Sequence, residues 1–336
     1  MGREITFLQA VNEALHIAMK GDPDVVLLGE DVAGGGGRED EGIEEAWGGV
    51  MGVTKGLYKA FGPERVRDTP ISEMGFMGAA VGAAVTGLRP VVELMFMDFI
   101  GVAFDPLLNQ AAKLRYMFGG KARVPITVRT MTGAGLRAAA QHSQTLYNIT
   151  TAVPGLKTVC ASTPHDVKGL LLASIRDDDP VIFCEPKALY GVRGEVPEGD
   201  YTIPLGQAAV PREGSDVSLV GVGATVRTAL EAATALEADG ISAEVVDLRS
   251  LSPLDEDAIL SSLEKTGRLV VIDEAPPRCG IASDIQGLCV DRGFDFLNAP
   301  VKKVTAPHTP VPFSPPLEDA YLPSVDKVIA AVGELF

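Results

Sequence analysis

Short apolar runs alternate with segments of helical periodicity along the whole chain, and this alternation limits the fold more than any other feature. In the first half of the chain, runs rich in β-branched residues and leucine occur at 25–29, 91–96, 126–130 and 181–185. Strands that alternate with helices are typical of a parallel sheet covered by helices. The N-terminal part of the chain is therefore predicted to be an α/β domain.

A second alternating series follows the segment GVRGEVPEGDYTIPLGQ, which is rich in glycine, proline and charged residues. Such a break in composition is typical of a linker between domains. The second series has strand candidates DVSLVG, AEVVDL and RLVVID and helical patterns at about 224–239, 255–265 and 280–292. The sequence predicts two tandem α/β domains with mainly parallel sheets, over residues 1–190 and 207–336, joined by a linker at 191–206.

Composition excludes several classes of function. A chain of 336 residues with 46% hydrophobic residues can bury a sizeable core. Its net charge of −16 disfavours nucleic acid as a partner, because phosphate binding needs clustered lysine and arginine. The longest uncharged apolar stretch, 74–88, is too short and too rich in glycine to cross a bilayer. No secretory pattern opens the chain and the cysteines form no CxxC pair, so we expect reduced core thiols and a cytoplasmic protein.

Two motifs have both a structural and a functional interpretation. GVGATV at 221–226, followed later by Asp247, resembles part of a dinucleotide-binding fingerprint, but the third glycine is missing and a simple strand-to-helix turn is favoured. IRDDDP at 175–180 places three aspartates at the end of a helix that Thr163 and Pro164 begin, where the helix dipole prefers cations. Either a metal cation bound through oxygen atoms resolves this conflict, or the aspartates are solvated.

Glu73 and His142 are the candidate catalytic residues. Glu73 precedes a glycine- and alanine-rich run without charge until Arg89, and Ser72 is predicted to cap the helix that begins there. The carboxylate is either a favourable charge in the first helical turn or a buried acid that needs a partner, and local reasoning leaves both open. His142 lies among polar residues that can orient an imidazole for proton transfer, whereas His165 is expected to be exposed.

Several long motifs resemble one family, the beta subunit of the decarboxylating component of 2-oxo acid dehydrogenase complexes. The motifs are DTPISEMGF at 68–76, LLGEDV at 27–32, AAAQHSQ at 138–144, PGLK at 154–157 and DVKGLLLASIRDDDPVIF at 166–183. The resemblance implies a thiamine-diphosphate enzyme with the transketolase-like fold. Within the family the chain looks closest to the acetoin dehydrogenase branch, through the segments at 40–57, 93–101, 115–130 and 305–315.

The resemblance assigns roles to individual residues. Glu73 would hydrogen-bond the aminopyrimidine ring of the cofactor and favour its imino tautomer, and Glu30 would lie near the same site. Ile71 and Phe99 match positions that pack against this ring. His142 matches a histidine that assists proton transfer or acyl transfer. The positions that surround a structural potassium ion in relatives are matched by Ile126, Ser174, Ile175, Asp177 and Asp179.

The resemblance also implies partners. In the family, an alpha subunit holds the cofactor diphosphate through Mg²⁺ with a GDG motif and a later asparagine, and this chain lacks that motif. The cofactor would then lie between chains in a heterotetramer of two alpha and two beta subunits. The implied reaction cleaves acetoin and transfers the acetyl group to the lipoyl group of an acyltransferase component. Pyruvate or a branched 2-oxo acid is the alternative substrate, and an NAD-binding oxidoreductase is the distant alternative.

Overall fold

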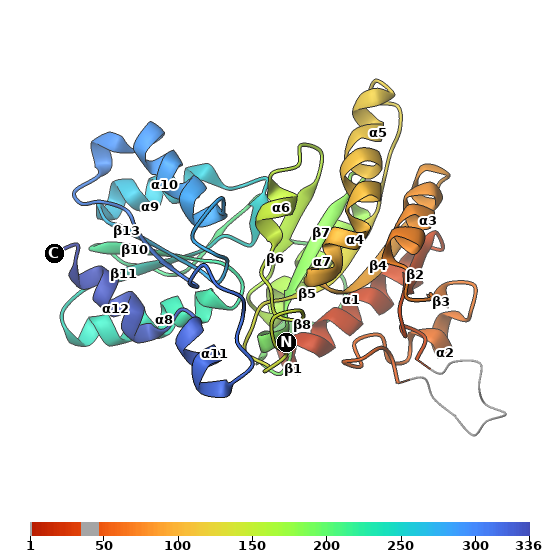
Figure 1. Cartoon of the computed structure of the whole chain (residues 1–336), viewed down its shortest axis with the longest axis horizontal. Helices are drawn as coiled ribbons and strands as arrows, with labels where there is room; N and C mark the ends of the chain where they lie inside the picture. The colour runs from red at the N-terminus through yellow and green to blue at the C-terminus, as the bar shows by residue number, and fades with distance from the viewer. Residues whose placement is uncertain (1, 35–46) are drawn as a thin grey trace.

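The computed structural model describes residues 2–34 and 47–336, which form two α/β units side by side (Figure 1). Residues 40–46, part of one segment that carries the acetoin-branch resemblance, lie outside this description. The first unit is built on a seven-stranded sheet in the order β12-β6-β7-β5-β4-β2-β3. Its strands are β2 (Val25–Gly29), β3 (Val66–Asp68), β4 (Arg89–Phe96), β5 (Thr127–Thr132), β6 (Lys157–Cys160), β7 (Val181–Pro186) and β12 (Ser250–Ser252).

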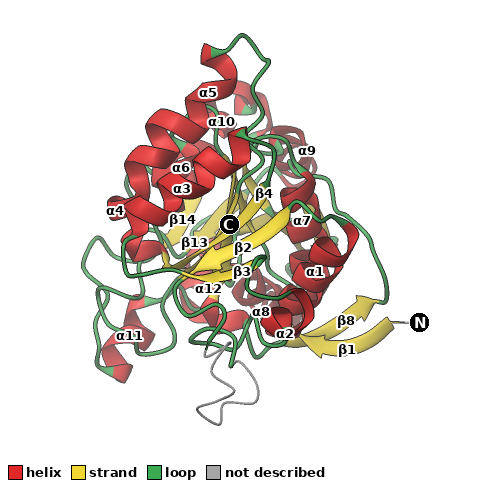
Figure 2. Ribbon diagram, turned by 90° about the vertical axis from the view of Figure 1, so that its right-hand side faces the viewer, coloured by secondary structure: helices red, strands yellow, loops and turns green. Residues whose placement is uncertain are grey.

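Helices cover both faces of this sheet (Figure 2). One face packs against α1 and α7, which also contact each other, and the other face packs against α3 and α4. A 3₁₀ turn, η2 (Met97–Phe99), leads into α4, and a π-helical segment, η3 (Pro106–Ala111), joins α4 to α5. The helices are α1 (Phe7–Gly21), α2 (Leu57–Phe61), α3 (Glu73–Val85), α4 (Ile100–Asp105), α5 (Ala112–Met117), α6 (Tyr147–Thr151) and α7 (Pro164–Arg176).

The second unit repeats the same layering around a five-stranded sheet in the order β14-β13-β10-β11-β9. Four of its strands are parallel, and β9 is antiparallel to β11. The strands are β9 (Ala209–Arg212), β10 (Val217–Gly221), β11 (Ala243–Asp247), β13 (Leu269–Asp273) and β14 (Lys302–Thr305). The helices are α8 (Thr225–Ala238), α9 (Glu256–Thr266), α10 (Ile281–Arg292), α11 (Pro315–Tyr321) and α12 (Val325–Gly333), with a short 3₁₀ turn, η5 (Phe294–Phe296), after α10.

Capping side chains fix the starts of α1 and α7, and the start predicted at Thr163 and Pro164 is confirmed. The Thr6 hydroxyl accepts a hydrogen bond from the Gln9 backbone N–H, and the Gln9 side chain accepts one from the Thr6 N–H, which completes a capping box at α1. At α7 the Thr163 hydroxyl accepts from the Asp166 N–H, and Pro164 takes the first helical position. Local sequence therefore determines where these two helices begin.

The two units share structure as well as a linker. β12 comes from the C-terminal half of the chain but pairs with β6 of the first sheet, and one hydrophobic cluster runs from the first unit into the second. The predicted linker contains β8 (Arg193–Pro197), which pairs with β1 (Gly2–Thr6) in a two-stranded sheet set apart from the main sheet (Figure 2). The units are therefore fixed relative to each other by pairing and packing.

All four cysteines are free thiols, and three of them are buried as expected. Cys279 is exposed, so the prediction of a core thiol is wrong there, because this residue lies in the turn before α10. Among the described residues, no helix combines the length and the apolar character needed to cross a membrane.

Candidate functional site

The predicted catalytic and cofactor residues follow four neighbouring parallel strands. In the sheet order β5-β4-β2-β3, Glu30 follows β2, Glu73 comes shortly after β3, Phe99 comes shortly after β4, and His142 lies in the segment after β5. The carboxyl ends of parallel strands meet at one edge of a sheet, where α/β proteins bind ligands. The topology therefore brings four of the predicted residues to one edge of the first unit.

Glu73 is the first residue of α3, and only 9% of it is exposed. Ser72 holds the N-cap position, but its hydroxyl makes no capping hydrogen bond, so the predicted Ser72 cap is wrong. The backbone explains the difference, since ψ is 71° at Ser72 but near 159° at the capping residues Thr6 and Thr163. Glu73 is left as the polar side chain at the start of this apolar helix.

Glu30 and Glu73 form a pair of neighbouring carboxylates. Burial raises the pKa of Glu30, and the negative charge of Glu73 raises it further. Among the described residues, no side chain or backbone group forms a hydrogen bond or an ion pair with the Glu73 carboxylate. Glu73 is thus a nearly buried acid, at the positive end of a helix dipole, with its hydrogen-bonding capacity unused.

Two phenylalanine rings pack against His142. The imidazole meets Phe96 edge-on at 4.8 Å between ring centroids and Phe99 at 5.5 Å, with interplanar angles of 84° and 86°. Phe96 and Phe99 are themselves edge-on at 5.9 Å. Edge-to-face contacts of this kind restrict the plane of each ring. The structure thus brings the predicted residues Phe99 and His142 together.

Ile71 is presented to solvent, with 83% of its surface exposed. It lies two residues before Glu73, in the connection between β3 and α3. An isoleucine with so little cover, beside an acid without a hydrogen-bonding partner, fits a flat heterocycle with an apolar face and one hydrogen-bonding nitrogen. The residues of this chain therefore fit the pyrimidine end of thiamine diphosphate.

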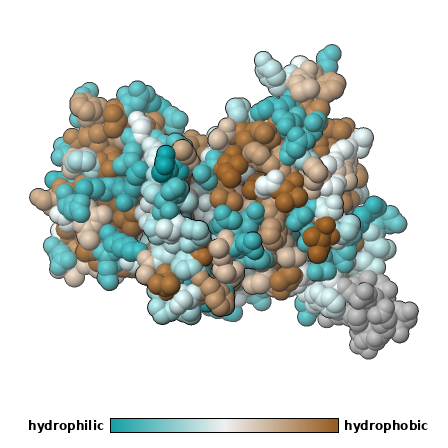
Figure 3. Space-filling view, viewed as in Figure 1, coloured by the Kyte–Doolittle hydropathy of each residue, from teal (hydrophilic) through white to brown (hydrophobic). Residues whose placement is uncertain are grey.

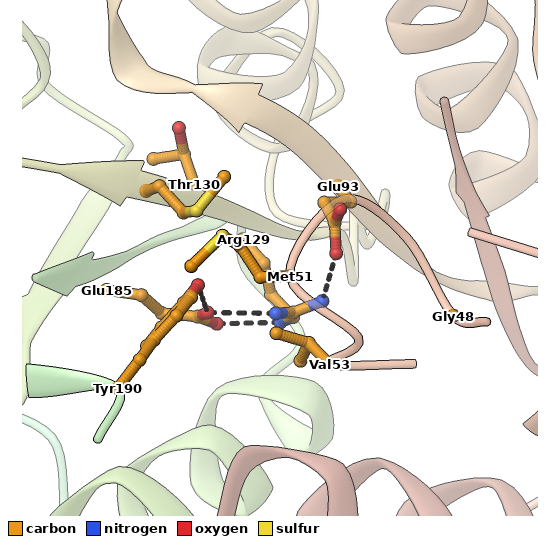
Figure 4. Close-up of a pocket in the computed structure, with 9 residues that line it drawn as sticks. Gly48, Met51, Val53, Glu93, Arg129, Thr130, Glu185 and Tyr190 are labelled. Atoms are coloured by element: carbon orange, nitrogen blue, oxygen red, sulfur yellow. Dashed lines mark hydrogen bonds and ion pairs between the residues drawn. The ribbon is translucent and has the colours of Figure 1, made fainter. Parts of the chain in front are cut away.

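A buried ion network lies in the same sheet and was missed by sequence reasoning (Figure 4). The Arg129 guanidinium donates two hydrogen bonds to Glu185, at 2.7 and 2.8 Å, and one to Glu93 at 2.8 Å. The Tyr190 hydroxyl donates to Glu185 Oε2 at 2.7 Å, the oxygen that also accepts from Arg129 Nη2. Figure 4 shows the guanidinium between the two carboxylates, which come from β4 and β7 on either side of β5. The signal in the sequence was a single charged residue in each of three otherwise uncharged strand runs, at 91–96, 126–130 and 181–185.

Burial and pairing oppose each other in this network. Burial alone would lower the pKa of Arg129, but the charges of Glu185 and Glu93 outweigh it and leave that pKa raised. Burial raises the pKa of Glu93 although Arg129 acts in the opposite direction. Glu93 in turn adds to the raised pKa of Glu30. The network therefore connects electrostatically to the carboxylate pair at the sheet edge.

Lysine and arginine side chains already bind several groups of the predicted potassium site. Lys157 binds both carboxylate oxygens of Asp177, at 2.8 and 2.6 Å, and Arg115 binds Asp179 at 2.7 Å. Arg89 donates to the backbone carbonyls of Ile175 and Asp177, at 3.3 and 3.0 Å. These side chains counter the conflict between the helix dipole and the aspartates. The remaining predicted carbonyls accept backbone hydrogen bonds: Ile126 from Val181 and Ser174 from Asp177.

The GVGATV turn has a packing role. A Cβ atom added to Gly223 would lie 2.7 Å from the Cys160 sulfur, because the turn fits against the first unit. The Thr225 hydroxyl accepts from the Val222 N–H and is 2.6 Å from the Ile272 carbonyl, to which it donates. The contacts favour the interpretation of a strand-to-helix turn and leave the nicotinamide alternative without support.

Comparison with known proteins identifies the family. The profile described as the pyrimidine binding domain of transketolase matches residues 3–193, and that of the transketolase C-terminal domain matches residues 206–328. The chain belongs to the transketolase family. This transketolase-family chain is 64% identical to the beta subunit of acetoin:2,6-dichlorophenolindophenol oxidoreductase of Bacillus subtilis (strain 168), over 100% of this chain and 98% of the relative.

Further relatives place the chain among the beta subunits of the family. The Cupriavidus necator protein of the same name is 58% identical over 98% of this chain and 97% of its own length, and the pyruvate dehydrogenase E1 beta subunit of Bacillus subtilis is 45% identical over 97% of each. A solved structure, "Split gene transketolase, inactive beta4 tetramer", aligns with a TM-score of 0.78 at 25% identity over 98% of both chains. The predicted transketolase-like fold is confirmed.

Proposed function

We propose that this chain is the beta subunit of a thiamine-diphosphate-dependent enzyme that oxidises acetoin. The main support is the difference in similarity: relatives named for acetoin are 64% and 58% identical, and those named for pyruvate dehydrogenase are at 45% or below. The supporting geometry lies at one edge of a pyrimidine-binding domain. It consists of Glu73, which has no hydrogen-bonding partner among the residues the structure describes, and His142, whose ring plane is set by aromatic neighbours. Pyruvate is the alternative substrate, since the pyruvate dehydrogenase relatives also cover nearly the whole chain.

Glu73, Glu30, Ile71 and Phe99 would hold the pyrimidine end of the cofactor. When bound, thiamine diphosphate supplies the carbon nucleophile that cleaves the bond beside a carbonyl group. The Glu73 carboxyl group would hydrogen-bond the pyrimidine ring nitrogen and hold the proton there. The raised pKa of Glu30 lets Glu30 keep its proton at a higher pH than an isolated carboxylate would. Ile71 and Phe99 would pack against the ring and exclude water.

His142 would move a proton at the substrate. An imidazole can donate and accept a proton near neutral pH, and Phe96 and Phe99 fix the plane in which His142 does so. The same side chain would face a lipoyl group when the acetyl group is transferred to an acyltransferase component. The chain is thus proposed to supply both the acid that orients the cofactor and the base that faces the substrate.

The enzyme would need a second chain. The relatives are named as subunits, and a beta chain of a split transketolase is described as inactive in a beta4 tetramer. Apolar side chains are exposed over the first unit (Figure 3), among them Met74 and Val85 of α3 and the α5 tip at 116–118. We propose that such surface is covered in a cytoplasmic heterotetramer of two alpha and two beta chains, with the alpha chain holding the diphosphate through Mg²⁺.

A potassium ion near Asp177 is the least supported part of the proposal, since Lys157 and Arg89 already bind the groups in question. It would have to displace one of these cations. A thermal midpoint that is higher in potassium than in sodium salts, and that loses this difference in Asp177→Asn, would support the ion. Equal thermal midpoints in potassium and sodium salts would contradict a bound potassium ion.

Mixing the two chains tests the proposed function. Dye reduction with acetoin, measured with 2,6-dichlorophenolindophenol and thiamine diphosphate, should be absent for this chain alone and should appear when an alpha chain is added. Activity should saturate near one alpha chain per beta chain. Acetoin oxidation by this chain alone would contradict the proposal, because this chain would then hold the whole cofactor.

A further inference from the structure

The segment 133–144, which carries His142, is attached to the C-terminal unit by two buried glutamates. Glu274 follows β13, and Glu318 lies in α11, and both belong to the second unit. Glu318 has no exposed surface, and Glu274 is 9% exposed. Both glutamates come from the second unit, so their burial against a segment of the first unit needs its own explanation.

Glu274 holds the beginning of the segment. Its carboxylate accepts a hydrogen bond from the Ala134 backbone N–H, and a Cβ atom added to Gly133 would lie 2.9 Å from a carboxylate oxygen. Gly133 also has φ +89°, which favours glycine. The buried Lys187 ammonium donates to the Gly133 carbonyl and lies 6.0 Å from the centroid of the Phe96 ring. The segment is therefore anchored where it leaves β5.

Glu318 holds the next turn of the segment with both carboxylate oxygens. One oxygen accepts from the Gly135 N–H at 2.8 Å, and the other accepts from the Arg137 N–H at 3.2 Å and from the Arg137 guanidinium at 2.6 Å. The guanidinium also reaches Asp319 at 2.7 Å, but that carboxylate is mostly exposed. Glu318 binds backbone N–H groups, whereas Asp319 contacts the Arg137 side chain. Glu318 therefore fixes the path of the chain as well as the Arg137 side chain.

The residues after this anchor adopt strained backbone angles. Arg137 has φ 57° and Ala139 has φ 61°, in the left-handed region that residues other than glycine and asparagine rarely occupy. The Ala139 carbonyl then accepts the His142 N–H at 3.3 Å, which forms the turn that presents the imidazole. On the far side, the Gln144 N–H and side-chain amide donate to Asp98. Such strain persists only where surrounding contacts over-determine it.

We propose that Glu318 is a positioning residue that sets the place of the His142 imidazole from the C-terminal domain. The inference rests on the proposed role of His142, and it assigns the second domain a part in the chemistry of the first. Without the carboxylate, the strain at Arg137 and Ala139 would relax, and the turn that carries His142 would shift. Misplacement of a reacting group by about 1 Å can cost on the order of a hundredfold in rate.

Glu318→Gln in the reconstituted alpha–beta complex tests the inference. Glutamine keeps the size of the side chain but places an N–H donor against the Arg137 donors. We expect kcat for acetoin to fall about tenfold, with KM within about twofold, because a displaced proton donor affects the chemical step. Limited trypsin digestion should cleave after Arg137 about tenfold faster, which reports the loop independently of activity. Asp319→Asn, which removes only a contact to the guanidinium, is the matched control and should change neither.

A double-mutant cycle with His142→Ala separates positioning from general structural damage. If Glu318 acts through His142, Glu318→Gln should lower kcat by less than about twofold in the His142→Ala background. A full tenfold loss in that background, or unchanged kcat and cleavage in the single variant, would overturn the inference. Normal activity of His142→Ala would instead refute the proposed role of His142, and the trypsin result would still report whether Glu318 holds the segment.

If the Glu318→Gln complex does not assemble, Arg137→Lys gives the same test. Lysine keeps the trypsin site but cannot bridge Glu318 and Asp319 as the planar guanidinium does. We expect kcat to fall about threefold and cleavage after residue 137 to become about threefold faster. In the His142→Ala background the effect on kcat should disappear. No change in either measurement would overturn the inference.

Discussion

Glu73 and Glu318 are both buried glutamates, and their surroundings differ at the scale of single atoms. Glu318 accepts hydrogen bonds from two backbone N–H groups and a guanidinium, whereas Glu73 has neither a hydrogen bond nor an ion pair among the described residues. An acid whose hydrogen-bonding capacity is not used by the described residues can bind a ligand. This difference makes Glu73 a candidate for chemistry and Glu318 a candidate for structure.

Replacement of Glu73 should separate activity from stability. Glu73→Gln in the alpha–beta complex is expected to lower acetoin oxidation by at least about a hundredfold, the lower range for removing an acid–base group. The thermal midpoint should not fall, because no partner loses a hydrogen bond. Dye reduction and a thermal melt of the same preparation measure both quantities.

Glu64→Gln is the control for this variant, since Glu64 is exposed and forms a surface ion pair with Arg67. It should leave both quantities unchanged. Activity of Glu73→Gln within a fewfold of that control would mean that Glu73 is not the group that orients the cofactor.

At the scale of elements, charged residues inside strands hold the first sheet together across three neighbours. Glu93, Arg129 and Glu185 come from the neighbouring strands β4, β5 and β7. Propensity and periodicity identify such strands but do not say which strand lies beside which. These charges meet because their strands are neighbours in the sheet. The strand order was not predicted, so the network was not predicted either.

Arg129→Ala should destabilise the chain strongly. Removal of one partner from a buried ion pair leaves an uncompensated charge and typically costs about 3–5 kcal/mol. Urea unfolding followed by circular dichroism measures the loss. Arg227→Ala, which breaks an exposed pair with Glu231 on one helix, should cost less than about 0.5 kcal/mol. Equal losses in the two variants would show that the network contributes little.

Asp247 at the end of β11 should make stability depend on pH. Burial raises its pKa to about 7 from an ordinary 3.8, although hydrogen bonds from Ser162 and Arg249 act in the opposite direction. Between these two values the folded chain keeps a proton that the unfolded chain has lost, so the free energy of unfolding falls as pH rises through this range.

Asp247→Asn should remove that slope. Relative to wild type, the variant should gain up to a few kcal/mol between pH 4 and pH 7, measured as the difference in unfolding free energy at each pH. Asp239→Asn, an exposed aspartate after α8, should follow the wild-type slope. A slope that Asp247→Asn leaves unchanged would assign the pH dependence to other groups.

At the scale of the whole molecule, the sequence predicted the α/β layers and most strands and helices, but not how the two units meet. The helix start at Thr163 depends on side chains within three residues, so local reasoning found it. The insertion of β12 into the first sheet and the hold of Glu318 on the His142 segment join residues about 90 and 180 positions apart. Contacts of that kind leave no local pattern.

The residues of the candidate site were predicted one by one through the family resemblance. The chemistry of the single residues did not identify the site. Glu73 and His142 carry no local signature that separates catalysis from capping or packing. Their common edge became visible only through the order of four parallel strands. Ser72, by contrast, matched the capping pattern and failed because of its backbone angle.

Substrate preference of the reconstituted alpha–beta complex tests the central claim most directly. Rates of dye reduction with acetoin, pyruvate and 2-oxoisovalerate, measured side by side, give kcat/KM for each. We predict a value for acetoin at least about tenfold above the other two, a difference of about 1.4 kcal/mol in transition-state stabilisation. A higher kcat/KM for pyruvate or 2-oxoisovalerate would contradict the account and make this chain the beta subunit of a 2-oxo acid dehydrogenase.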